Sequence, residues 1–199
     1  MTVRGDQMNH LELFTDGGAI KINGKFYGSS SYVIKFQNKY FTTNFPVAEG
    51  TNNHYELKAI RDGLLALLRG WQCKTLDIWI ISDSEYSIKS ITKWSKNWRK
   101  INGVWYTSSG SPALNWELIM EIKSLLENFR SYKFIKVKSH ISTNLEESYE
   151  KFLKINKIKM TFIDYLKLIR MNELCDSNIT KQFNQKRREI ANELGREFV

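Results

Sequence analysis

The N-terminal region alternates between apolar and polar positions, as the strands of an antiparallel sheet do. Leu11 and Leu13 share one face with Thr15, and the Asn23-Gly24 pair favours a tight turn between strands. A polar break at residues 37–38 separates two further stretches rich in aromatic and β-branched side chains. The pattern predicts an antiparallel meander of three strands, at about residues 11–15, 26–36 and 40–45.

The period changes after residue 52. Leu57, Ile60, Leu64 and Leu67 recur every three or four residues, which places them on one face of a helix that ends near Gly70. Residues 76–81 are almost all apolar, and this favours a strand covered on both faces. The same reading predicts helices at about 84–97 and from about 115, a fifth strand at 134–137, and a last helix from about 172 to the end. Strands that alternate with helices indicate an α/β fold.

The segment between His140 and Met171 is dense in both lysine and large apolar residues. Thr161 and Asp164 have the spacing of a capping box, so we expect two short helices here, at about 146–154 and 161–170. The apolar content indicates that the segment packs on the rest of the chain. It is either a structural elaboration or a cover over a functional site.

Composition narrows the class of protein. With 42% apolar and 13% aromatic residues in 199 positions, the chain has the make-up of one globular domain covering 1–199. Thirty Lys and Arg against 21 Asp and Glu give a net charge of +9, which favours a polyanionic partner such as nucleic acid over a generically basic protein. Only two cysteines and no apolar run of membrane length are present, so we expect a cytoplasmic protein without a disulfide framework.

Four acidic residues stand in short, recognisable motifs. Asp16 lies in FTDGG, Glu56 in TNNHYELKA, Asp83 in ISDSEYS and Asp176 in NELCD. Taken singly, each has a structural explanation as a turn former or as a favourable charge in the first turn of a helix. Together they predict a divalent-metal site, because hard cations such as Mg²⁺ prefer oxygen ligands and keep several waters.

The order of these motifs resembles the type 1 ribonuclease H family over nearly the whole chain. The resemblance implies a ribonuclease H-like fold: a five-stranded mixed sheet, three strands antiparallel and two parallel, flanked by helices. It also implies an endonuclease that hydrolyses the RNA strand of RNA–DNA hybrids with two Mg²⁺ ions, which Mn²⁺ may replace, and leaves 3′-hydroxyl and 5′-phosphate ends. In that family's manner, Asp16 would bridge both ions, and Glu56, Asp83 and Asp176 would complete their coordination.

The same resemblance assigns further site residues. His140 corresponds to a mobile-loop histidine that assists proton transfer or product departure, unless it is an incidental surface residue. Substrate contacts are implied for Gly17, Asn52, Asn53, Glu85 and Asn115. Glu85 stands where many relatives have Gln, so its recognition of sugar hydroxyls is expected to differ in detail.

A basic segment at about residues 93–106 resembles the protrusion with which some family members grip the DNA strand. Its charged and aromatic residues are Lys93, Trp94, Lys96, Trp98, Arg99, Lys100 and Trp105. Such a surface binds phosphates independently of sequence and is sensitive to salt. The alternative is a solvated helix face whose tryptophans pack on the protein's own core.

Two features depart from the family pattern. The loop at residues 139–141 reads Ser-His-Ile in place of a Gly-rich loop, and the segment from His140 to Asp176 is longer than usual. We expect a helical insertion at about 141–170. The competing functions are a nuclease of the same superfamily that acts on DNA junctions or ends, and a catalytically inactive hybrid-binding module. We expect a monomer that stands alone, in preference to a reverse-transcriptase fragment.

Overall fold

The computed structural model describes residues 10–37, 39–138 and 144–193. The strands are β1 His10–Ile22, β2 Lys25–Phe36, β3 Lys39–Asn44, β4 Ala48–Glu49, β5 Asp77–Ser82, β6 Arg99–Ile101, β7 Val104–Tyr106 and β8 Ser131–Lys136. The helices are α1 Asn52–Gly70, α2 Glu85–Thr92, α3 Trp116–Leu126, α4 Leu145–Asn156 and α5 Phe162–Glu193, with short 3₁₀ helices η1 Cys73–Thr75 and η2 Trp94–Asn97. Among these helices none is long and apolar enough to cross a membrane.

The main sheet has the strand order β3-β2-β1-β5-β8, and β4 adds a short pairing to β2. The first three strands are antiparallel, whereas β5 pairs parallel to both β1 and β8. Asn23 and Gly24, both with positive φ, form the turn between β1 and β2. The predicted ribonuclease H-like α/β fold, with a five-stranded mixed sheet, is confirmed.

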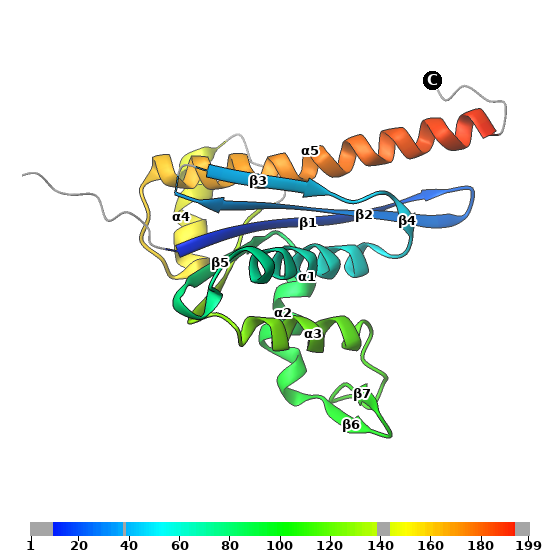
Figure 1. The fold of residues 1–199 in the computed structure, drawn as a ribbon, viewed down its shortest axis with the longest axis horizontal. Coiled ribbons are helices and arrows are strands. Elements are labelled where there is room, and N and C mark those ends of the chain that lie inside the picture. The colour runs from blue at the N-terminus through cyan, green and yellow to red at the C-terminus, as the bar shows by residue number, and fades with distance from the viewer. Residues whose placement is uncertain (1–9, 38, 139–143, 194–199) are drawn as a thin grey trace, which may run out of the picture.

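Helices cover both faces of the sheet. Figure 1 shows α5 along one face and α1 along the other, with α2 and α3 beyond α1. The alternation of β1 explains this arrangement: Leu11 and Leu13 are buried in the cluster that contains the apolar stripe of α1, and Phe14 is buried on the opposite side with Ile169 and Cys175 of α5. The sheet is therefore the middle layer of three, and β1 lies at its centre.

Two helical predictions were wrong in detail. The helices expected at 161–170 and from 172 are one continuous helix, α5, because neither Gly nor Pro interrupts the chain near Met171 and the buried stripe runs on through Asn172. The capping box at its start is confirmed, since Asp164 donates its backbone N–H to Thr161 Oγ1 at 3.1 Å. The helix expected to reach Asn97 ends at Thr92, whose hydroxyl donates to the carbonyl of Ile88.

The segment after α2 contains a short β-hairpin. β6 and β7 pair through a turn at Asn102 and Gly103, which both have positive φ. This is the same Asn-Gly turn chemistry as between β1 and β2. In Figure 1 the hairpin projects from the body of the molecule beyond α2 and α3.

Candidate active site

Three of the four acidic residues come together at the centre of the sheet. Asp16 lies on β1, Glu56 on the first turns of α1, and Asp83 directly after β5. The parallel ladder between β1 and β5 ends with Phe14 opposite Ile81, so the chain carries Asp16 and Asp83 onward at the same level. One carboxylate oxygen from each of the three residues lies within 4.8 Å of the others.

Gly17 explains how α1 comes close enough for Glu56 to join the strand residues. A Cβ atom at position 17 would lie 2.2 Å from both the backbone nitrogen of Glu56 and the carbonyl carbon of Tyr55. Only glycine leaves room for this approach. The Gly17 backbone also donates hydrogen bonds to the carboxylates of Asp16 and Glu56.

Burial and mutual repulsion raise the pKa values of these acids. Desolvation, together with the charges of Asp83 and Asp176, raises the pKa of Asp16 to about 8, although a hydrogen bond from the Gly17 backbone opposes the shift. Burial also holds the pKa of Glu56 well above its ordinary value, with added repulsion from Asp16 and Asp83. Nearby carboxylates with raised pKa values mark a site that is incomplete without a cation.

The donor set fits a hard divalent metal ion. All three groups offer carboxylate oxygens, the ligands that Mg²⁺ and Mn²⁺ prefer. Glu56 Oε2 is buried and accepts no hydrogen bond from any residue in the described ranges. A buried acceptor of this kind costs free energy unless something else pairs with it, and a metal ion would do so.

Asp176 faces the same region from α5 but stands apart from the group of three. Its side chain is exposed, and its charge acts on Asp16. The preceding residue, Cys175, is fully buried and its thiol donates to the carbonyl of Phe14 at 3.6 Å, two residues before Asp16. The role of Asp176 as a metal ligand stays a prediction. His140 lies outside the described residues.

The asparagines of the TNN motif differ in their surroundings. Asn52 Oδ1 accepts a hydrogen bond from the backbone N–H of Ala19 at 3.2 Å, and its side chain also bonds to Glu56. Asn52 therefore ties the start of α1 to β1. Asn53 is exposed beside it and is free of such contacts within the described structure.

Glu85, at the start of α2, is held by two lysines. It forms ion pairs with Lys89 and with Lys136 of β8, the latter at 2.6 Å. These hydrogen bonds lower the pKa of Glu85 to about 2. Lys136 is not among the site residues predicted from the sequence, although it pairs with Ser82 across the sheet, next to Asp83. The signal that could have indicated it is the alternation of lysines in KVKSH, residues 136–140.

The basic segment lies away from the acidic triad, on η2 and the β6–β7 hairpin. Lys93, Lys96, Arg99 and Lys100 are exposed, Trp94 is 40% exposed, and Trp98 and Trp105 are half-buried. Asn115, the residue before α3, has a left-handed backbone and donates to Tyr86 Oη at 3.3 Å. The structure thus contains both features weighed for this segment, exposed cations and packed tryptophans.

Comparisons with known proteins agree with this architecture. The RNase H family profile matches residues 8–184. Ribonuclease H of Tropheryma whipplei strain Twist is 35% identical over 140 residues, which are 70% of this chain and 80% of that protein. Ribonuclease HI of Haemophilus influenzae is 31% identical over 127 residues, 63% of this chain and 77% of that protein.

A solved structure shares the fold. The protease-reverse transcriptase of a foamy virus, in complex with an RNA/DNA hybrid, superposes with a TM-score of 0.52 at 14% identity, over 74% of this chain and 19% of that chain. The family profile covers most of the sequence, and three of the four predicted carboxylates meet in space. The chain belongs to the RNase H family, whose members hydrolyse the RNA strand of RNA–DNA hybrids.

Proposed function

We propose that this RNase H family member cuts the RNA strand of RNA–DNA hybrids internally, using two divalent metal ions held by Asp16, Glu56 and Asp83, with Asp176 as a further ligand. The observation that carries the proposal is the convergence of three carboxylates, two of them buried, within 4.8 Å of one another. Mg²⁺ is the proposed ion, and Mn²⁺ a substitute. Bound ions of this kind activate a water and stabilise the leaving oxygen.

The chain's own residues prepare this chemistry. A bound cation would favour the deprotonated forms of Asp16 and Glu56, whose pKa values burial and the charges of nearby carboxylates raise in the metal-free protein. Gly17 and Asn52 hold Glu56 against β1, which keeps the carboxylates in place before substrate arrives. His140 is proposed to assist proton transfer or product departure. The proposed hydrolysis leaves 3′-hydroxyl and 5′-phosphate ends.

Substrate recognition is proposed for the exposed residues around this centre. Asn53 stands at the start of α1 where it can reach sugar hydroxyls, the groups that distinguish RNA from DNA. The exposed cations of residues 93–100 are placed to neutralise the phosphates of the other strand. Glu85 is already paired with two lysines, which weakens its candidacy as a hydroxyl acceptor.

The test uses end-labelled RNA–DNA hybrid beside RNA–RNA and DNA–DNA duplexes, with and without chelator. Cutting confined to the hybrid, dependent on metal, and reduced at least about 100-fold in Asp16→Asn supports the proposal. The matched control is Glu150→Gln, which neutralises an exposed carboxylate on α4 and should cut at the wild-type rate. Cutting of DNA duplexes would select a DNA nuclease instead, and hybrid binding without cutting an inactive binding module.

A further inference from the structure

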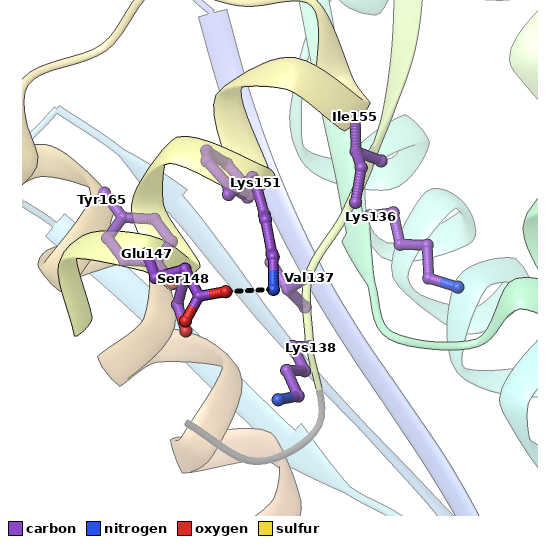
Figure 2. Close-up of a pocket in the computed structure, with 9 residues that line it drawn as sticks. Lys136, Val137, Lys138, Glu147, Ser148, Lys151, Ile155 and Tyr165 are labelled. Carbon is purple, nitrogen blue, oxygen red and sulfur yellow. Dashed lines mark hydrogen bonds and ion pairs between the residues drawn. The ribbon is translucent and has the colours of Figure 1, made fainter. Parts of the chain in front are cut away.

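A groove runs over the end of β8, beside the acidic triad. It consists of two hollows of about 330 and about 420 Å³, which share Lys136 and Ile155 as lining residues. We call it the β8 groove, with Lys89, Lys136, Lys138, Lys151 and Ile155 along it. Figure 2 shows the first hollow, where α4 carries Lys151 over the segment that bears Lys138, while Lys136 points to the other side.

The groove begins next to the catalytic carboxylates. Lys136 is paired with Ser82 across the parallel ladder, and Val137 donates its backbone N–H to the carbonyl of Ser82 at 3.1 Å. Asp83 is the next residue after Ser82. Because neighbouring strands lie about 4.8 Å apart, a strand of nucleic acid held at Asp83 would lie within reach of this surface.

The groove is positively charged. Its charged lining consists of four lysines and two glutamates, Glu85 and Glu147, which leaves a net charge of +2. Glu147 pairs with Lys151 at 2.5 Å, whereas Lys138 acts on Glu147 only through its charge and forms no ion pair within 4.0 Å in the described part of the chain. The Lys151 pair is exposed at both ends, so it holds the lysine only weakly and leaves it able to bind a phosphate.

The groove also has an apolar contact. Ile155 is 63% exposed and lines both hollows. The sugars of a nucleic-acid backbone present apolar faces between their phosphates. Cations that flank an exposed apolar residue therefore suit a sugar-phosphate backbone better than a free anion.

Asn156 holds the groove in shape. Its side chain is buried, accepts from the backbone N–H of Lys136 at 2.7 Å and donates to the carbonyl of the same residue at 2.8 Å. These two bonds dock α4 onto the edge of β8 and set Lys151 in a fixed position relative to Lys136. A preformed cluster of cations binds with a smaller entropy cost than one that must assemble.

We propose that the β8 groove binds the phosphates of the RNA strand next to the cleavage site, with Lys138 and Lys151 as the principal ligands. This deepens the proposed function and rests on it. The strand that is cut must pass Asp83, and the groove continues from there. The basic hairpin projects from a different part of the molecule, beyond α2 and α3 (Figure 1).

The test measures hybrid binding by fluorescence anisotropy in the inactive Asp16→Asn protein, over a series of salt concentrations. Adding Lys138→Ala and Lys151→Ala should raise the dissociation constant about 10-fold and reduce the salt slope by about 2, one for each lost phosphate contact. The matched control, Lys154→Ala, removes an exposed charge from the same helix outside the groove and should change the dissociation constant less than about twofold. An unchanged dissociation constant and slope in the double variant would overturn the proposal.

A second measurement identifies the strand. Each hybrid carries a single uncharged methylphosphonate linkage, whose position is moved along either strand. At one or two positions in the RNA strand, this linkage should weaken binding to the Asp16→Asn protein. At the same positions it should not weaken binding to the protein that also carries Lys138→Ala and Lys151→Ala. The same result on the DNA strand would overturn the assignment. Wild-type protein that fails to cut hybrid would refute the proposed function separately, because these binding measurements use inactive protein.

Discussion

At the scale of single residues, the candidate active site buries carboxylates that repel one another, and a bound cation would reduce this repulsion. Asp16 and Glu56 are only 8% and 7% exposed, and each lies close to further negative charge. Burying like charges is unfavourable, so the metal-free protein retains protons that exposed carboxylates would lose. Metal binding and proton release are therefore coupled at this site.

This coupling predicts that the metal-free protein becomes less stable as the pH rises. An aspartate loses its proton near pH 3.8 in the unfolded chain, whereas folded Asp16 keeps it up to about pH 8. Between those values the folded state binds more protons, so the free energy of unfolding falls with rising pH, by at most about 1.4 kcal/mol per pH unit for one group. Denaturant unfolding with chelator from pH 5 to 8 measures this dependence.

Asp16→Asn serves as the control for the titration. It should remove the part of the slope that Asp16 contributes, whereas Glu56, whose pKa is also raised by burial, should keep its own part. Mg²⁺ should restore wild-type stability at the high end of the range, with an affinity that rises up to about tenfold per pH unit for each proton released. Wild-type stability that is level over this range, or that rises with pH, would contradict the raised pKa of Asp16.

At the scale of elements, the site depends on how α1 and α4 meet the sheet. α1 packs closely on β1 because Gly17 has no side chain, and α4 is attached to β8 by hydrogen bonds of the buried Asn156 amide. The first contact positions a catalytic carboxylate. The second covers the exposed backbone groups of an edge strand, which would otherwise be open to pairing with other chains.

Gly17→Ala should destabilise the fold by about 2–3 kcal/mol, because the new Cβ overlaps the backbone at residues 55 and 56. Displacement of α1 should also lower the cleavage rate at least about tenfold by moving Glu56. Thermal unfolding and single-turnover cleavage measure the two effects. Gly70→Ala is the control: nothing lies within 4 Å of its Cβ position, and its effect should stay within about 0.5 kcal/mol.

Asn156→Ala should cost about 2 kcal/mol of stability, since it leaves the backbone N–H and carbonyl of Lys136 without partners under α4. Hydrogen exchange should become faster at Lys136 while β1 stays protected. Asn184→Ala, which removes an exposed amide from α5, should change neither quantity. Unaltered exchange at Lys136 would mean that α4 does not depend on this amide for its docking.

At the scale of the whole molecule, positive charge surrounds an acidic centre. The net charge of +9 arises although all three residues of the triad are acidic, so the excess of cations lies outside the triad. The hairpin segment and the β8 groove are two such surfaces. A polyanion is attracted over a long range and then held where its phosphates meet these cations.

Combined replacement of Lys96, Arg99 and Lys100 by Ala should raise the KM for hybrid at least about tenfold and reduce the salt slope of binding by about 3, with a small change in kcat. Steady-state cleavage at several salt concentrations measures all three. Replacing Lys74, Lys154 and Lys181 by Ala removes the same charge elsewhere on the surface. If both triple variants lose affinity equally, binding depends on net charge and not on the hairpin.

The local elements and the family can be predicted from the order of residues along the chain. Alternation placed Leu11 and Leu13 on one face of β1, the capping box located the start of α5, and the four acidic motifs pointed to a metal-dependent nuclease. These features depend on backbone sterics and on side-chain spacing within a few residues, so they can be predicted from the local sequence.

How distant segments meet becomes apparent only in the folded protein. The continuity of α5, the docking of α4 by Asn156, and the closeness of Asp16, Glu56 and Asp83 all depend on packing between residues far apart in sequence. The raised pKa of Asp16 follows from burial, and the β8 groove forms where four elements converge. Desolvation and charge proximity are properties of the folded arrangement, so no reading of neighbouring residues could supply them.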